Sequence, residues 1–133
     1  MLKPFQRRCL LASTTYSKGV DASLYYNPSC SKCRNAEALL ANRGVEATVV
    51  RYLDDPPTPD ELTRLMAKLG IEDPRMIMRT SEPVYTELGL VDASAGELLY
   101  AIECHPILLE RPIFVLENRA VIARPPERLL ELL

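Results

Sequence analysis

The 133-residue sequence lacks two features that would point to large charged or lipid partners. No apolar run approaches the ~18 residues that indicate a membrane-spanning helix. There is no basic stripe either, because 16 Lys and Arg residues are mixed along the chain with 18 Asp and Glu residues, for a formal net charge of -2. Nucleic-acid-binding proteins usually carry such a stripe. We therefore expect neither a nucleic acid nor a membrane as partner.

The sequence is also poor in metal ligands. His105 is the only histidine, and the four cysteines are Cys9, Cys30, Cys33 and Cys104. This set leaves too few ligands at zinc spacing, so no metal site is expected. A few scattered thiols in a midsized acidic chain indicate a reducing, cytoplasmic setting rather than a disulfide scaffold. The only close pair is the Cys-x-x-Cys of Cys30 and Cys33, which in that setting indicates redox or catalytic chemistry.

The length fits one domain preceded by a short leader. Residues 1–22 begin with basic residues and then a short apolar run, Cys9 to Ala12. That run is shorter than the ~7–15 residues of a secretory signal. We expect residues 1–22 to be a disordered leader in which Cys9 has no role, and residues 23–133 to form the domain.

The domain begins with a pattern typical of two parallel strands joined by a helix. Residues 23–27 form a short apolar and aromatic run that ends at a proline turn, which predicts a buried strand. Apolar residues at helical spacing predict a helix over 31–42, stopped by Gly44. Residues 45–52 predict the second strand. Strands joined by a crossover helix should be parallel.

Capping-box patterns predict where two later helices start. Thr58 and Glu61 have the spacing of one box, and Gly70 should end the helix that follows. Ser94 and Glu97 have the same spacing ahead of another apolar helical pattern. We therefore expect a helical segment in the middle of the domain.

The C-terminal third predicts an antiparallel hairpin and a last helix. Pro112–Val115 and Ala120–Ala123 are apolar runs around a short turn, and Pro125 opens a helix that runs to Leu133. The element order is then β-α-β, a helical segment and β-β-α. This order predicts an α/β fold: a thioredoxin-like mixed sheet with a helical insertion.

The first strand-to-helix junction carries the chemistry. The first amides of a helix have no intrahelical partner and hold partial positive charge, so they favour a thiolate and can bind a tetrahedral anion. We expect Cys30 to be the nucleophile and the loop Asn27–Arg34 to cradle an oxyanion. Ser31, Lys32 and Arg34 would contribute to binding it.

Other candidate residues keep two interpretations. Cys33 is either a small helix residue that faces the core or a resolving thiol. Cys104 and His105, which precede a proline, fit packing and helix termination better than catalysis.

Three arginines complete the candidate site. Arg79, Arg111 and Arg124 lie near predicted turns, and guanidinium groups suit an oxyanion because they stay charged and fork. Considered singly, each arginine is expected to be a solvated surface charge. Only the fold can bring them together.

Four sequence blocks together resemble the glutaredoxin-dependent arsenate reductase family. They occur in the family's order with similar spacing, and the resemblance covers about residues 23–133. The blocks are Tyr26-Asn27-Pro28-Ser29-Cys30-Ser31-Lys32-Cys33-Arg34-Asn35; Arg79 with Glu82-Pro83 and Glu87-Leu88-Gly89-Leu90; His105-Pro106-Ile107-Leu108 with Arg111-Pro112; and Arg124-Pro125-Pro126-Glu127.

The resemblance implies a thioredoxin-like fold and a mechanism. Cys30 would attack arsenate, glutathione would attack the thiol-bound arsenic as co-substrate, and glutaredoxin would resolve the mixed disulfide and release arsenite. No bound cofactor is implied. Arg79, Arg111 and Arg124 match the family's oxyanion-binding arginines. Pro112 matches a proline at the start of a strand, expected to be cis.

Two departures from the family pattern bear on this mechanism. Cys33 stands where many members have serine, so an internal disulfide with Cys30 could replace the reaction with glutathione. Tyr26 stands where some members have a histidine, so thiolate formation must depend on the helix end and on basic residues.

Two alternatives to arsenate reduction remain at this stage. Spx-type redox regulators, which bind RNA polymerase, share the fold and carry a Cys-x-x-Cys at the same place. The three arginines favour anion chemistry over such a switch. A family member acting on another oxyanion is the second alternative, because phosphate, sulfate and arsenate resemble one another.

Overall fold

The computed structural model describes residues 21–133, and Cys9 and residues 1–20 of the expected leader lie outside the described residues. Four strands form one mixed sheet in the order β2-β1-β3-β4. Within residues 21–133, no helix combines the length and apolarity needed to cross a membrane. The strands are β1 (Ala22–Tyr25), β2 (Thr48–Val50), β3 (Ile113–Leu116) and β4 (Arg119–Ile122).

The N-terminal β-α-β unit is confirmed. Strand β1 pairs in parallel with β2, and α1 (Ser31–Asn42) connects them and stops before Gly44, whose φ is +71°. Strand β2 is shorter than the predicted run of residues 45–52. The chain leaves the sheet because the amide of Tyr52 donates to the carbonyl of Val50 at 3.0 Å, which turns the tyrosine inward.

The helical insertion follows β2 and starts with a confirmed capping box. It contains α2 (Pro59–Leu69), α3 (Pro83–Glu87) and α4 (Ala95–Cys104), linked by the 3₁₀ turns Pro74–Ile77, Leu90–Asp92 and Pro106–Leu108. The amide of Thr58 donates to Glu61 at 2.8 Å, and the amide of Glu61 donates back to the Thr58 hydroxyl at 3.2 Å.

The other predicted ends of α2 and α4 are also found. Gly70 caps α2 in the left-handed conformation with a φ of +74°. Ser94 and Glu97 form the second capping box at 2.8 and 3.2 Å, ahead of α4. Both helices therefore begin where local chemistry predicts, and α2 also ends there.

The predicted C-terminal hairpin is present, shifted by one residue. Strand β3 is antiparallel to β4, and Glu117 adopts a φ of +56° in the turn between them. The last helix is a 3₁₀ helix, Pro126–Leu132. In its first turn the amide of Arg128 donates to the carbonyl of Pro125, three residues earlier, at 3.0 Å.

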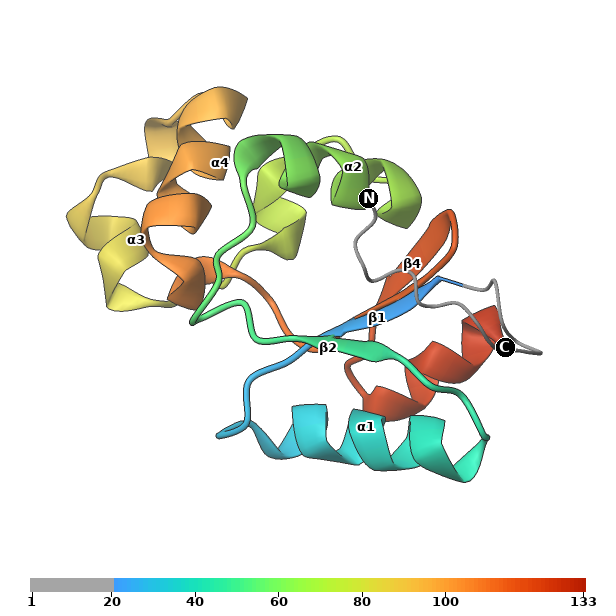
Figure 1. Cartoon of the computed structure of the whole chain (residues 1–133). Helices are drawn as coiled ribbons and strands as arrows, with labels where there is room; N and C mark the ends of the chain where they lie inside the picture. The colour runs from blue at the N-terminus through green and yellow to red at the C-terminus, as the bar shows by residue number, and fades with distance from the viewer. Residues whose placement is uncertain (1–20) are drawn as a thin grey trace.

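Helices cover both faces of the sheet (Figure 1), and each face has its own apolar core. Helix α1 and the 3₁₀ helix 126–132 cover one face, and the helical insertion lies on the other. The side chains of β3 point alternately to the two faces of the sheet, as in any strand, so they enter both cores. Ile113 and Val115 join the insertion's core, whereas Phe114 joins the core with α1.

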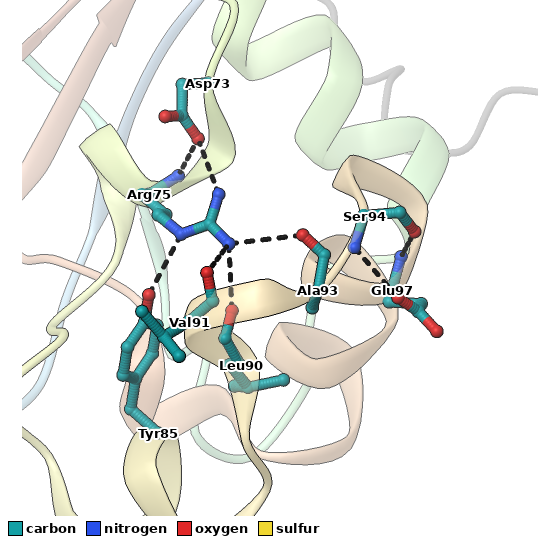
Figure 2. A network of polar contacts seen from close by, with 8 residues as sticks. All are labelled: Asp73, Arg75, Tyr85, Leu90, Val91, Ala93, Ser94 and Glu97. Atoms are coloured by element: carbon teal, nitrogen blue, oxygen red, sulfur yellow. Dashed lines mark hydrogen bonds and ion pairs between the residues drawn. The ribbon is translucent and has the colours of Figure 1, made fainter.

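One arginine ties the insertion together (Figure 2). Nε of Arg75 donates to the hydroxyl of Tyr85 at 2.9 Å, and Nη1 lies 3.6 Å from the carboxylate of Asp73. We call this cluster the Arg75 hub. Its Nη2 donates to three backbone carbonyls, those of Leu90 at 2.9 Å, Val91 at 2.9 Å and Ala93 at 3.1 Å.

Candidate active site

The loop between β1 and α1 holds Cys30 as the residue that precedes the helix. The Cys30 amide donates to the carbonyl of Asn27 at 2.9 Å, and the Ser29 amide donates to the Asn27 side chain at the same distance. The guanidinium of Arg34 donates to the carbonyl of Pro28 at 2.7 Å. These bonds fix the loop, and the residue Cys30 is only 9% exposed.

The surroundings of Cys30 favour its thiolate. Burial raises the pKa of Cys30, but the amides of Cys33 and Lys32, the Cys33 thiol and the Arg111 guanidinium lower it by more, so the net shift is downward. The Cys30 side chain forms no full cap hydrogen bond with these amides. The amides of Lys32 and Cys33 nevertheless direct partial positive charge toward the sulfur, as expected at a helix N-terminus.

Cys33 keeps its proton to higher pH than Cys30 does. The Cys33 residue has no exposed surface. The net pKa of Cys33 is raised to about 12: burial is the main cause and interaction with Cys30 adds to it, whereas the backbone of Asn27 and the charge of Arg111 act in the opposite direction. Cys33 therefore both faces the core and contacts Cys30, so it satisfies the geometry of each interpretation that the sequence allowed.

Arg111 presents buried donors that no described residue accepts. Its Nε and Nη1 are covered from solvent, and neither has a hydrogen-bond partner within residues 21–133. Its charge acts on both Cys30 and Cys33, which places the guanidinium beside the thiols. The Arg111–Pro112 peptide bond is cis, as the resemblance implied, and Pro112 is fully buried ahead of β3. Buried donors without acceptors are rare, so this pair calls for an acceptor from a ligand.

The other two predicted arginines lie in the same region, each with a protein partner. Nη1 of Arg124 donates to the carbonyl of Arg111 at 3.0 Å, and its Nε lies 3.9 Å from Glu110. Nη1 of Arg79 pairs with the carboxylate of Glu82 at 2.6 Å. Arg124 is thus joined to Arg111 directly, whereas Arg79 is held by the residue that precedes α3.

Tyr52 belongs to this region although the sequence did not single it out. The residue is 1% exposed, and burial raises its pKa to about 12. The charges of Arg111 and Arg79 lower the pKa of Tyr52, and those of Cys33 and Cys30 raise it, so all four groups lie near the phenol. A signal existed, because Tyr52 follows a strand parallel to the one that ends at the Cys30 loop. Parallel strands bring such ends together.

The remaining predicted residues lie at or beyond the rim of the site. Ser31 and Lys32 are exposed in the first turn of α1, and the amide of Lys32 faces Cys30. Arg34 uses its guanidinium to hold Pro28, so its part in anion binding stays a prediction. Cys104 is an exposed free thiol at the end of α4, and His105 is that helix's C-cap residue.

These features define a class before any comparison with other proteins. A mixed sheet with a helical insertion, a Cys-x-x-Cys pair at the first strand-to-helix junction and a cis proline before β3 describe a thioredoxin-like α/β thiol protein.

The particular family follows from comparison with known proteins. The ArsC family model matches residues 25–132, and the chain belongs to that family. It is 44% identical over 112 residues to an arsenate reductase of Haemophilus influenzae, an alignment that covers 83% of this chain and 97% of that one.

Solved structures agree with this assignment and confirm the predicted fold. An arsenate reductase from Vibrio cholerae is similar with a TM-score of 0.83 and 43% identity, over 86% of this chain and 98% of that one. A putative arsenate reductase from Yersinia pestis gives a TM-score of 0.81 and 44% identity, over 84% of this chain and 99% of that one.

Proposed function

We propose that this chain reduces arsenate to arsenite and that Cys30 is the nucleophile. The observation that carries the proposal is the pair of buried, unpartnered nitrogens on Arg111 beside a cysteine whose pKa is lowered. Donors of this kind are completed by an oxyanion. Relatives that are similar along almost their whole length bear the name arsenate reductase, which supports arsenate as that oxyanion.

Binding would use the helix start and Arg111 together. The amides at the start of α1 face the Cys30 sulfur, and arsenate oxygens would lie between these amides and the free nitrogens of Arg111. Arg124, which is joined to the Arg111 carbonyl, would extend the positive surface. Arg79 would take part by exchanging Glu82 for a substrate oxygen, because both are negatively charged acceptors.

The reaction begins with a bond between sulfur and arsenic. The Cys30 thiolate attacks arsenic, and one arsenate oxygen leaves as water after it is protonated. The product is a thiol-bound arsenic(V) adduct. We propose that glutathione, with glutaredoxin, supplies the two electrons that reduce arsenic to arsenite and return Cys30 to a thiol. Both donors belong to the reducing cytoplasm, where we expect the protein to act.

The same site would admit other tetrahedral oxyanions. Sulfate and phosphate have similar shapes and charges, so an anion cradle alone does not select arsenate. Arsenate is distinguished by the ease with which a thiol reduces it. Sulfate and phosphate should therefore act as competitive inhibitors of weak affinity and should not be reduced.

The alternative function, a redox-sensing regulator, would not require the arginines to bind an anion. A switch that works through a Cys30–Cys33 disulfide does not need a buried guanidinium with free donors. Leaving such donors without partners costs roughly 1–3 kcal/mol. The unpartnered nitrogens of Arg111 therefore favour anion chemistry over a switching surface.

The test is arsenate reduction by the purified full chain. Arsenite should form with glutathione and glutaredoxin as donors, and Cys30→Ser should abolish it because serine is not ionised at neutral pH. Cys104→Ser is the matched control, since Cys104 is also a free cysteine but lies exposed at the end of α4. A run with thioredoxin as donor compares the two reductants. Unchanged arsenite production by Cys30→Ser would reject the nucleophile assignment.

A further inference from the structure

We infer that Cys33 is the resolving thiol of this site and that it releases arsenite by forming an internal Cys30–Cys33 disulfide. In this sequence of steps, glutathione and glutaredoxin reduce that disulfide after arsenite has left, and they do not attack the arsenic adduct itself. The inference rests on the proposed function and assigns the order of its electron-transfer steps.

The geometry gives Cys33 an advantage over any external thiol. Cys30 precedes α1 and Cys33 is the third residue of that helix, so the two side chains are neighbours on one helical turn. Each of the two thiols also shifts the pKa of the other, which places the two sulfurs close together. An external thiol must instead approach a residue that is only 9% exposed.

The step balances without any further reactant. The Cys33 sulfur attacks the Cys30 sulfur, and the bond between sulfur and arsenic breaks with its electron pair left on arsenic. Arsenic(V) becomes arsenic(III), and the two thiol sulfurs are oxidised to one disulfide. The proton of Cys33 passes to an oxygen of the departing arsenite. A dithiol donor or two molecules of glutathione then reduce the disulfide.

Cys33 would enter the second step with its proton. Burial raises the pKa of Cys33, so the thiol is still protonated when Cys30 binds arsenic. Its proton is then available to the arsenite oxygen that leaves. The charge of Arg111, which lowers the pKa of Cys33, favours that transfer.

A single turnover without any external thiol tests the inference. The full chain, with Cys9→Ser and Cys104→Ser so that only two cysteines remain, is reduced, freed of reductant and mixed anaerobically with excess arsenate. About one arsenite per chain should appear, together with a mass loss of two hydrogens and loss of both free thiols. A sample without arsenate should keep both thiols.

A variant at Cys33 provides the second arm. Cys33→Ala in the same background should release no arsenite without a donor and should carry a covalent arsenic adduct on Cys30. Glutathione should then release arsenite from that adduct. If the variant does not fold, the position of the disulfide in the two-cysteine chain decides the matter alone.

The outcomes separate the inference from the proposed function. Arsenite that forms only after glutathione is added, with the Cys33 thiol still free, would overturn the role of Cys33 and leave Cys30 as the nucleophile. If the chain neither releases arsenite nor forms an adduct, with or without glutathione and glutaredoxin, the proposed function fails and the inference fails with it.

Discussion

Arg75 and Arg111 are both partly covered arginines, but their guanidinium groups are used in opposite ways. Arg75 binds a tyrosine hydroxyl, a carboxylate and three backbone carbonyls (Figure 2). Arg111 has two buried nitrogens without a partner among the described residues. The Arg75 hub lies within the insertion, whereas Arg111 lies at the junction with β3, beside Cys30.

The contrast separates stability from function. A satisfied guanidinium holds segments together, and the Arg75 hub joins two 3₁₀ turns and helix α3 of the insertion. An unsatisfied buried guanidinium destabilises the folded state until a ligand completes it. The fold therefore tolerates an energetic cost at Arg111, which an anion would offset under the proposed function.

The largest expected effect is that of Arg111→Ala on catalysis. Removal of the buried donors should lower kcat/KM for arsenate about 100-fold or more. The melting temperature of the free protein should stay unchanged or rise, because the variant no longer buries unpartnered nitrogens. Steady-state kinetics and thermal unfolding of the same preparation measure both quantities.

Arg111→Lys is the control for charge at this position. Lysine keeps the charge but loses the fork, so its kcat/KM should lie between that of the parent and that of the alanine variant. A lower melting temperature with normal kinetics for Arg111→Ala would show that the residue is structural, and the contrast with Arg75 would be lost.

The second-largest effect is expected at Arg75, where a substitution should lower stability more than catalysis. Arg75→Ala should lower the melting temperature by several degrees, because it leaves Tyr85 and three carbonyls without their donor. Its kcat/KM should fall less than that of Arg111→Ala. Arg51→Ala is the matched control, since Arg51 is an exposed arginine that pairs with Asp54 alone. An unchanged melting temperature for Arg75→Ala would contradict a structural role for the hub.

Local chemistry explains why much of the fold could be predicted. Thr58 with Glu61 and Ser94 with Glu97 satisfy helix amides with neighbours three residues away, so sequence alone locates both helix starts. The order of strands and helices, the parallel pair and the hairpin follow from such local patterns. Strand β2 ends at residue 50, before the end of the predicted run 45–52. The chain turns out of the sheet there because Tyr52 packs into the core of the insertion.

The arrangement of the candidate site could be predicted only in part, because it depends on distant residues. The helix start marks Cys30 in the sequence, and the arginines were candidates by type. The pairing of Arg79 with Glu82 joins residues three apart, but no local pattern shows that the Nε and Nη1 of Arg111 are buried without a partner. Arg75 went unnoticed for the same reason, because its acceptors lie as far as Ala93, eighteen residues away.

The third effect concerns the titration of Cys30. Because the pKa of Cys30 is lowered, its thiolate persists to lower pH than that of an ordinary thiol, and alkylation should slow only as the pH falls through that lowered value. Arg111→Ala should move the profile toward higher pH, because the charge of Arg111 lowers the pKa of Cys30. Arg75→Ala should leave the profile in place.

The measurement is the rate of iodoacetamide alkylation against pH, with Cys9→Ser and Cys104→Ser so that other reactive thiols do not contribute. Mass spectrometry assigns the modified cysteine, since Cys33 stays protonated over this range. A parent profile centred at the value of an ordinary thiol would contradict the helix-start effect. Equal shifts for the two arginine variants would show that Arg111 does not act on Cys30 directly.

The smallest expected effect lies beside the Arg75 hub, at Glu97. The hydrogen bond from the Ser94 amide lowers the pKa of Glu97. The ionised carboxylate therefore adds stability above the ordinary glutamate pKa, and this stability is lost as the pH falls through the lowered value. Glu97→Gln keeps an acceptor for the amide but not the charge, so its melting temperature should depend less on pH in that acidic window.

Thermal unfolding of Glu97→Gln and the parent across that window measures the difference, with Glu72→Gln, an exposed glutamate outside the capping boxes, as control. The alkylation profile of Cys30 should be identical in all three proteins. If Glu97→Gln moved that profile, the capping box would act on the thiol site across the insertion. The distinction between the Arg75 hub, which stabilises the fold, and the thiol site, which we propose binds an anion, would then be wrong.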